Sequence, residues 1–405
     1  MALYNTTSNL GNWTSSLLTF LSYIIIFIIV VRFLRFLIID PVFRNTNNST
    51  NRPVFTNRRG GSSKMHPIPP PFRYGEDDSP HPAVAPSSSE TNDTTTEYEA
   101  SPADVLIVKR LIMAAGNLPL ELADMIVEQA EYWPCSSVTA DYSTLPRKVL
   151  GIRGSGNDEN KFLLRTEPLG LATWTPLNHE SWRSTQALPQ KLAQEFGADR
   201  FQEFVEEPPP ASNHPVRKLV FNIRSCDQGW GGDPSDQGTY RHSWTWFDAG
   251  LERFDAEARC DENCPLYTAG GEAKGDKGKD TRICSCAVRP IWPAVVTNAD
   301  NEGTAVLPRY DPGLHPTPDH MIQANKVATP GMQQHHVVWR WDDDVNPNSS
   351  DAEDLEKSGR GKATGNGEFV RSIKLGDTIT LWGRARFAGW ENRVEKVEVK
   401  VYWAV

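Results

Sequence analysis

Four cysteines in the second half of the chain are spaced closely enough to hold a metal ion. A C-x3-C pair and a C-x-C pair flank a hydrophilic loop, at Cys260, Cys264, Cys284 and Cys286. Four thiolates can bind zinc tetrahedrally, although zinc sites more often contain C-x2-C pairs. Disulfides and unpaired thiols are the alternatives, and disulfides are rare in a reducing cytosol. The sequence leaves these three states open, so it predicts no cofactor apart from zinc as one possible state of this cluster.

A second group of residues combines carboxylates, glycines and tryptophans. The turn-rich segment 226–238 contains Asp227 and Trp230 and leads into Trp244 and Trp246. Loops with carboxylates can bind calcium, and exposed tryptophans can stack on sugar rings. The alternative is an ordinary connecting loop followed by two tryptophans in the core. We keep Asp227, Trp230, Trp244 and Trp246 as candidate ligand-binding residues.

Neither motifs nor charge point to catalysis or to nucleic acid. Nucleophile elbows, metalloprotease helices, dinucleotide fingerprints and phosphate loops do not occur in a plausible context. The chain has 42 Lys and Arg against 51 Asp and Glu, and its net charge of -9 is opposite to the basic footprint of nucleic-acid-binding proteins. We predict no catalytic residue and no nucleic-acid partner, and an enzyme is disfavoured.

The N-terminal part of the chain contains an apolar segment of membrane-spanning length. No residue from Trp13 to Val31 is charged, and a helix of that length would extend about 28 Å, close to the thickness of the bilayer hydrocarbon. We predict a single transmembrane helix with an interfacial extension over residues 13–39, and a short lumenal tail over 1–12. The membrane-spanning positions include Leu17, Phe20, Ile24, Phe27 and Val31.

Charges beside this segment predict its orientation and its lipid contacts. Arginines follow the apolar run at once, which favours a cytosolic main domain. A cleaved signal peptide is the alternative, although the sequence lacks a basic n-region and an Ala-x-Ala-like site. Residues 32–73 are strongly basic and should contact anionic lipid, at about 1 kcal/mol per Lys or Arg close to the surface. The Pro-, Ser-, Thr- and Asn-rich segment 40–100 is predicted to be a disordered linker.

A helical hairpin is predicted over residues 101–134. Ser101-Pro102-Ala103-Asp104 has the N-cap, the proline and the acidic residue of a helix start, and Gly116 suits the position after the helix. A second amphipathic helix is expected from Leu118 until Pro134 stops it.

The start of that second helix resembles the first helix of an F-box. The segment 118–126 reads Leu-Pro-Leu-Glu-Leu-Ala-Asp-Met-Ile, and in F-boxes a Leu-Pro-x-Glu-Leu opening precedes a helix that docks on a ubiquitin-ligase adaptor. The resemblance implies a partner-binding role for Leu118, Pro119, Leu122 and Ile126. The alternative is a helix packed on its own domain.

The rest of the chain shows the two-residue alternation of antiparallel strands. It is clearest at 218–224, 243–247, 337–341, 377–382 and 397–403. We predict a mainly β fold, with a jelly-roll-like β-sandwich over 217–405 that carries the Cys-flanked insertion 260–286. Residues 135–216 are expected to be a connecting region, with short candidate strands at 148–150 and 161–164 and helical structure around 190–205.

Several of these stretches together resemble a group of uncharacterised filamentous-fungal proteins. They include Asp227-Gln228-Gly229-Trp230, Ser243-Trp244-Thr245-Trp246-Phe247 and Val399-Lys400-Val401-Tyr402-Trp403. The resemblance implies an F-box-like hairpin before a Trp-rich sandwich and carries no activity. We expect a single-pass membrane protein with a cytosolic recognition domain. The alternatives are a membrane-tethered ubiquitin-ligase substrate receptor and a lectin-like carbohydrate-binding sandwich.

Overall fold

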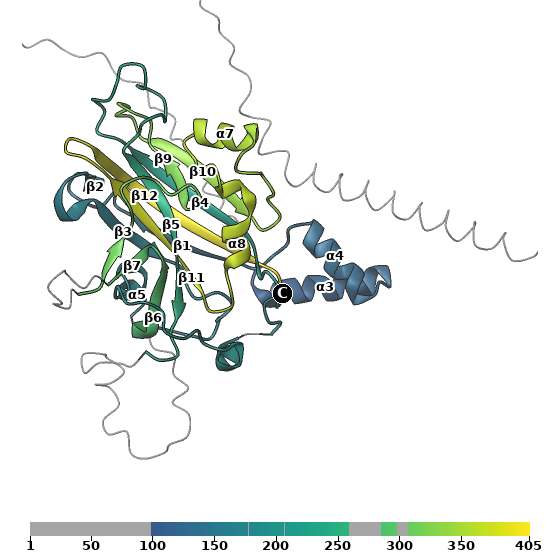
Figure 1. The fold of residues 1–405 in the computed structure, drawn as a ribbon. Coiled ribbons are helices and arrows are strands. Elements are labelled where there is room, and N and C mark those ends of the chain that lie inside the picture. Colours follow the sequence, from purple (N-terminus) through teal and green to yellow (C-terminus); the bar gives the residue numbers. More distant parts are fainter. Residues whose placement is uncertain (1–98, 177, 206, 259–284, 298–306) are drawn as a thin grey trace, which may run out of the picture. The chain divides into compact units, whose positions relative to one another are not determined.

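The computed structural model describes residues 99–405 except 177, 206, 259–284 and 298–306 (Figure 1). The chain divides into two compact units, Met1–Thr96 and Glu97–Val405, and only the second is described here. The predicted transmembrane helix, the basic residues 32–73 and most of the linker and of the Cys-flanked insertion lie outside the described residues. Among those that are described, no helix is both long enough and apolar enough to span a bilayer.

Two helices at the start of the described chain form the predicted hairpin. Helix α3 spans Pro102–Gly116, and Ser101 and Asp104 form a complete capping box at its start. Asn117, with φ 48°, adopts the left-handed conformation at the helix end that the sequence assigned to Gly116. Helix α4 spans Leu120–Gln129.

Helix α4 ends five residues before Pro134, which the sequence predicted as its stop. Glu131 has φ 53°, its N–H bonds to the carbonyl of Glu128, and the N–H of Tyr132 bonds to the carbonyl of Val127. These two bonds form a Schellman motif, which ends a helix by satisfying its last carbonyls. The sequence did not predict this helix end, because Glu131 rather than a glycine occupies the left-handed position.

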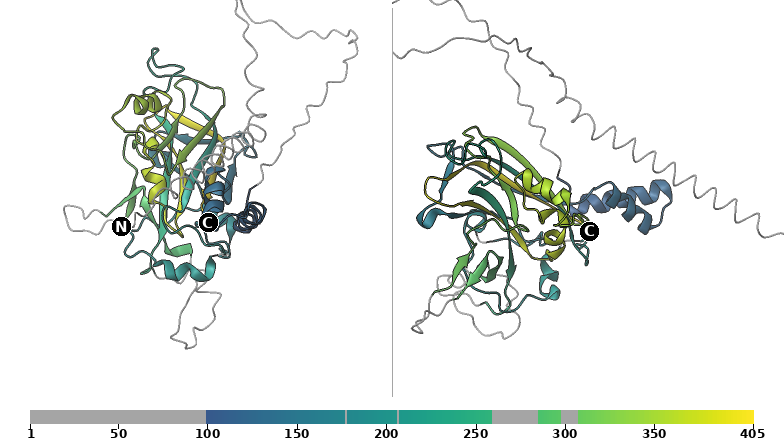
Figure 2. Two further views of the ribbon diagram at one scale, coloured as in Figure 1. Left: turned by 90° about the vertical axis from the view of Figure 1, so that its right-hand side faces the viewer. Right: turned by 45° about the horizontal axis from the view of Figure 1, so that its top comes forward.

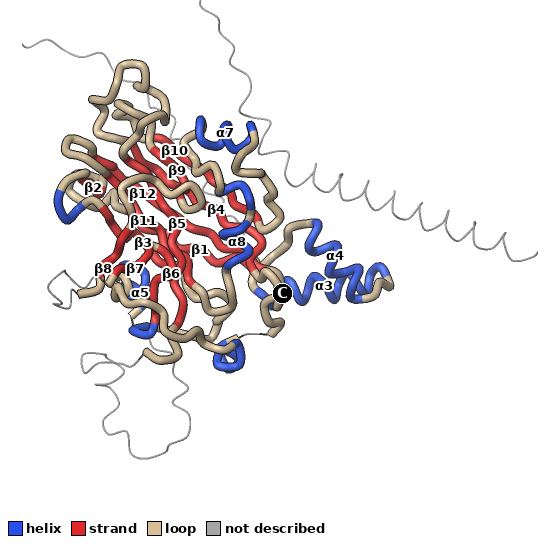
Figure 3. The backbone as a smooth tube through the Cα atoms, in the orientation of Figure 1, coloured by secondary structure: helices blue, strands red, loops and turns tan. Residues whose placement is uncertain are grey.

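The remainder of this unit is an antiparallel β-sandwich, which confirms the predicted mainly β class (Figures 1 and 3). One sheet has the order β1 (Cys135–Asp141), β12 (Glu391–Trp403), β4 (Val216–Cys226), β10 (Gln333–Arg340), and β2 (Leu150–Arg153) also pairs with β12. The other has the order β3 (Asn160–Arg165), β11 (Thr378–Ala385), β5 (Thr245–Phe254), β6 (Val288–Trp292), and β9 (Met321–Ala324) pairs with β5. Strands β7 (Ala294–Val296) and β8 (Arg309–Asp311) form a small ribbon.

Short helices connect the strands. They are α5 (His179–Ser184), α7 (Ser350–Lys357) and α8 (Glu368–Ser372), with single 3-10 turns η1 (Gly156–Asp158), η3 (Ser285–Ala287) and η4 (Thr364–Asn366). The helical structure expected over 190–205 is limited to the 3-10 segment η2 (Ala198–Phe204), which begins only after Gly197. Glycine disfavours continuous α-helix at that point.

The hydrophobic core lies between the two sheets. Val397, Val399 and Val401 alternate along β12 and are all buried, as the sequence predicted. They pack with Phe221 and Trp339 and with residues of the second sheet in one cluster. The inner strands of the two sheets are β12 and β4 in the first and β11 and β5 in the second, and all four contain stretches whose alternation predicted a strand.

The sequence predicted a connecting region over residues 135–216. The structure corrects this prediction, because the segment supplies three strands of the sandwich. Residues Cys135–Asp141 pair with β12 along their whole length, β2 continues on the same edge, and β3 pairs with β11. These strands are short or rich in Ser, Thr and Ala. Strand β3 contains the candidate strand 161–164, and β2 begins where the candidate 148–150 ends. Strand β1 had no strand signal of its own and is stabilised by its pairing with β12.

Candidate interaction site at the helical hairpin

The helical hairpin (α3 and α4) leaves much of its apolar surface uncovered. Twelve large apolar side chains are exposed in the described part of the chain, and five of them lie on these two helices. They are 41% to 65% exposed: Ile107, Leu111, Leu120, Leu122 and Met125. Single exposed apolar residues are common on protein surfaces, but a concentration on one small element is typical of an interaction surface.

The spacing of these residues places them in stripes along the two helices. Ile107 and Leu111 are four residues apart on α3, and Leu122 and Met125 are three apart on α4, so each pair shares one helix face. The opposite faces pack through Val105 and its contacts with Val127. Each helix therefore packs against the other through one face, and its other face is not covered by any described residue.

Ion pairs join the hairpin to the sandwich. Arg217 Nε on β4 lies 2.7 Å from Glu128 Oε1 on α4. Glu131, in the Schellman turn, accepts hydrogen bonds from Arg340 Nη2 at 2.8 Å and from Lys218 Nζ at 3.1 Å. The indole N–H of Trp133 donates to Glu128 Oε2 at 3.0 Å. Two carboxylates thus fix the end of α4 against strands β4 and β10.

The environment of Glu131 favours its charged form. Burial alone would raise the pKa of this carboxyl, but the hydrogen bonds and charges of Arg340 and Lys218 outweigh burial and leave the pKa below its usual value. The Arg340 guanidinium in turn has a raised pKa, chiefly through its hydrogen bond to Glu131. This pair is therefore ionised at neutral pH.

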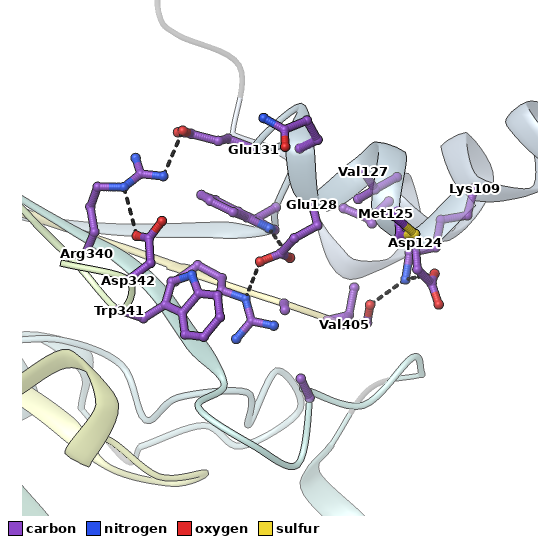
Figure 4. A pocket seen from close by; sticks show the side chains of 16 residues that line it. Lys109, Asp124, Met125, Val127, Glu128, Glu131, Arg340, Trp341, Asp342 and Val405 are labelled. Atoms are coloured by element: carbon purple, nitrogen blue, oxygen red, sulfur yellow. Dashed lines mark hydrogen bonds and ion pairs between the residues drawn. The ribbon is translucent and has the colours of Figure 1, made fainter. Parts of the chain in front are cut away.

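A pocket of about 640 Å³ lies behind the hairpin, between α4 and the sandwich (Figure 4). Met125 and Val127 contribute to its wall from the helix, and Trp341 from the chain after β10. Lys109 bonds to both the Val405 carbonyl and Asp124, with 2.9 Å between Lys109 Nζ and Asp124 Oδ1. The pocket is walled by charged groups that already pair with one another, so it suits a partner side chain better than a small charged ligand.

Figure 2 shows the hairpin projecting from the sandwich on the side where the chain ends. Its helices contact the sandwich near their junction with it, through the small cluster of Ala100, Val105 and Val127 and through Val405. An element that projects and carries exposed apolar stripes can dock a second protein without rearrangement of the sheets.

The four residues selected from the F-box resemblance fall into two groups. Leu122 and Pro119 are exposed, whereas Leu118 and Ile126 are half-buried. The sequence did not select Ile107 and Leu111, because the apolar residues of α3 surround the helix too evenly to show which face is covered.

The four candidate ligand-binding residues do not face one cavity. Asp227 is fully buried and accepts backbone N–H bonds from Gly229 at 2.8 Å and Thr329 at 2.9 Å, and another from Ala328. Burial raises the pKa of this carboxyl although those N–H groups oppose the shift. These hydrogen bonds join two loops. Both carboxylate oxygens of Asp227 therefore already accept hydrogen bonds from the backbone.

The three tryptophans of that group differ in exposure. Trp246 is fully buried, and its indole N–H donates to Asp248 Oδ1 at 3.0 Å. Trp244 is half-buried and lies edge-on to Phe387, with 4.6 Å between ring centroids. Trp230 is 62% exposed, above the turn that contains Gly389. Trp230 and Phe387 are the Trp and Phe residues of the described chain whose side chains are exposed.

The cysteine cluster is almost wholly outside the described residues. Cys286 lies half-buried in η3, and Cys260, Cys264 and Cys284 cannot be placed. Within the ranges that the structure describes, no group of three or more His, Cys, Asp or Glu side chains could hold a metal ion. Zinc binding therefore stays a prediction.

Comparisons with known proteins give this chain no relatives. The resemblances to an F-box helix and to a fungal protein group accordingly stay predictions from sequence. No family model, no curated protein and no solved structure matches the chain.

Proposed function

We propose that this chain is a single-pass membrane protein whose β-sandwich presents a helical hairpin as a docking site for another protein. The observation that carries the proposal is the set of five exposed apolar side chains on α3 and α4. Leaving apolar surface in water costs about 25 cal/mol per Å², and a partner that covers it regains that free energy. The paired charges beside the hairpin hold this surface in position.

Charge indicates what kind of segment would dock there. Residues 101–134 contain five acidic and two basic side chains, so a partner helix with an apolar stripe and basic flanks is complementary to the hairpin. Helix-in-groove recognition of this kind reads apolar anchors spaced three and four residues apart. The same acidity disfavours docking of the hairpin itself on an anionic bilayer.

Substitution of one exposed leucine tests this proposal. Leu111→Asp places a charge in the α3 stripe without removing a buried contact, whereas Leu314→Asp makes the same change at an exposed leucine outside the hairpin. Proteins that co-purify with the full chain should be lost with Leu111→Asp and kept with Leu314→Asp. An identical set of bound proteins for both variants would exclude the hairpin as the docking site.

The anchor is the other half of the proposal and rests on the uncharged, mostly apolar run from Trp13 to Val31. Alkaline extraction should leave the chain in the membrane pellet. Glycosylation reports its orientation, because Asn48, Asn92 and the exposed Asn348 lie in acceptor sequons on the C-terminal side of the anchor. Unmodified asparagines at all three support a cytosolic sandwich, and a shift in gel mobility on deglycosylation that maps to any of them would contradict it.

A ubiquitin-ligase substrate receptor is the second candidate. The exposure of Leu122 in the Leu-Pro-x-Glu-Leu segment favours it, because that side chain would have to reach an adaptor. A ubiquitin-ligase adaptor should co-purify with the full chain and be lost with Leu122→Asp. Failure to recover an adaptor with the wild-type chain would reject this candidate and leave general protein docking intact.

A lectin-like sandwich is supported by one surface, formed by the exposed Trp230 and Phe387. Phe387 has φ 66°, a conformation that costs free energy for an aromatic residue. Glycan-array binding that disappears with Trp230→Ala would favour this candidate, and binding that persists would reject it.

A further inference from the structure

Strand β1 lies at one edge of the first sheet, with no strand on its outer side among the described residues. It pairs with β12 from Cys135 to Asp141 without a shift of register. Just beyond its two ends, the N–H of Trp403 bonds to the carbonyl of Pro134, and the N–H of Tyr142 bonds to the carbonyl of Glu395. Backbone bonding alternates along an antiparallel pair. The even-numbered residues of β1 therefore bond to β12, and the backbone groups of its odd-numbered residues point away from β12.

Three residues along this outer side have backbone groups that are available for pairing. Neither the N–H nor the C=O of Ser137, Thr139 or Asp141 bonds to the backbone of another described residue. Thr139 and Asp141 are exposed, and Ser137 is half-buried. At Cys135 the edge is closed, because its N–H donates to the carbonyl of Ala100 at 2.9 Å. The available part of the edge is therefore the stretch 137–141.

This stretch lacks the features by which proteins usually prevent the addition of a strand. Such features are prolines, lysines, bulges and covering segments. The sequence of β1, Cys-Ser-Ser-Val-Thr-Ala-Asp, contains neither proline nor lysine, and its pairing with β12 has no bulge. On β10, at the opposite edge, the carbonyl of Val338 accepts from Arg360 Nη2 at 3.1 Å. The N–H of Arg340 on the same strand donates to Asp343 Oδ2 at 2.8 Å. One edge of the sheet is thus occupied by side chains, whereas β1 can accept a strand.

The positions of the available groups select one way of adding a second copy of the chain. Two antiparallel strands exchange two hydrogen bonds wherever outward-facing residues lie opposite one another. A two-fold axis at Thr139 places the two Thr139 residues opposite each other, and it places Ser137 of each copy opposite Asp141 of the other. All three available residues then pair. An axis at Val138 would instead direct Asp141 to Cys135, where the edge is closed.

Side chains on the outer face of the sheet complement one another in this register. Within one copy, Lys400 on β12 lies opposite Ser137. In the pair of copies, the carboxylate of Asp141 therefore lies beside the Ser137 hydroxyl of the second copy, with Lys400 on the next strand. Opposite charges and paired hydroxyls stabilise neighbouring strands. We propose that β1 pairs with β1 of a second copy of this chain, so that their first sheets form one continuous sheet with two-fold symmetry.

This contact lies outside the hairpin, so its failure would leave the docking role of the hairpin intact. Engineered cysteines test its register in the full chain in detergent. Thr139→Cys places two thiols on the axis, at a Cα–Cα separation of about 5.5 Å that suits a disulfide. We expect a disulfide-linked dimer on non-reducing gels.

Ser137→Cys is the matched control, because it lies on the same edge with the same native cysteines. In the proposed register its two copies are four residues out of line, about 14 Å apart, so they should not link. Equal linkage of Ser137→Cys and Thr139→Cys would overturn the proposal. So would an adduct of Thr139→Cys with a different protein, since that protein would then occupy the edge.

Sedimentation equilibrium under reducing conditions measures the dimer without a crosslink. Thr139→Lys places two like charges opposite each other on the axis, whereas Thr139→Val keeps a β-branched side chain there. Both substitutions leave the pairing of β1 with β12 intact, and circular dichroism should be the same for both. We expect Thr139→Lys to raise the dissociation constant of the dimer about tenfold and Thr139→Val to leave it unchanged. A monomeric wild-type chain, or a dimer that Thr139→Lys does not weaken, would overturn the proposal.

Discussion

The second sheet buries a pair of opposite charges. Arg384 Nε lies 2.9 Å from Asp248 Oδ2, and both side chains are almost fully buried. Burial raises the pKa of Asp248 and lowers that of Arg384, and the pairing of their charges opposes both shifts. The Arg384 guanidinium also lies 4.8 Å from the ring of Trp382. Such a pair adds little net stability, but either partner alone is costly.

We expect Arg384→Leu to destabilise the chain by about 3–5 kcal/mol, because it leaves Asp248 buried without a counter-charge. Urea unfolding of the purified protein measures this loss. The control is Lys357→Ala, which removes an exposed ion pair with Asp354 and should leave the unfolding midpoint unchanged. Equal midpoints for Arg384→Leu and wild type would show that water reaches the carboxylate.

His335 on β10 provides a pH-dependent contribution. It lies against the ring of Tyr240, and its Nε2 has no partner among the described residues. Burial, with a smaller effect from the charge of Lys326, lowers its pKa from 6.5 to about 4. The unfolded chain therefore binds this proton first, so stability is complete above about pH 6.5 and is lost as the pH falls toward 4.

The comparison of wild type with His335→Phe isolates this group from the carboxylates that titrate in the same range. The difference in unfolding free energy between the two proteins should change by about 3 kcal/mol between pH 7 and pH 4, with the wild type losing more. A constant difference across that range would mean that the pKa of His335 is the same in the folded and unfolded states.

Among the helices and strands, the sequence predicted the features that depend on residues close to one another in the chain. The capping box at Ser101 and the alternating valines of β12 are examples, since each depends on residues close in sequence. Strand β1 was not predicted, because its Ser-, Thr- and Ala-rich sequence becomes a strand only through its pairing with β12. The exposed stripe on α3 was likewise hidden, because the packing of α4 decides which face remains open.

The ion pairs of Glu131 should control how firmly the hairpin is held. Glu131→Gln keeps the side-chain size and removes the charge that Arg340 and Lys218 share. We expect the amides of α4 to exchange about tenfold faster, because charge-assisted hydrogen bonds contribute about 1.5–3 kcal/mol each and half of their strength depends on the charge. High salt should have a similar effect on the wild type.

Glu121→Gln is the control for that measurement, because Glu121 is exposed in the first turn of the same helix. It should change the exchange of α4 far less than Glu131→Gln does. Equal effects of the two substitutions would show that the apolar cluster, rather than the ion pairs, holds the hairpin.

For the whole molecule, the account combines a sandwich with an accessible hairpin. The sandwich buries most of its large apolar residues, in the core between the sheets and in a second aromatic cluster, whereas the two short helices of the hairpin alone expose five. The hairpin is a small element with many exposed apolar side chains, and this is the reason to assign recognition to it.

Site-specific photocrosslinking tests the docking role of the hairpin most directly. A photoreactive residue replaces Met125 in the full chain, and the same residue at Leu314 is the control, since both positions are exposed. We predict a discrete adduct with a protein partner at position 125 that Leu122→Asp abolishes and that position 314 does not give. Adducts that are absent at position 125, or that survive Leu122→Asp unchanged, would contradict the account.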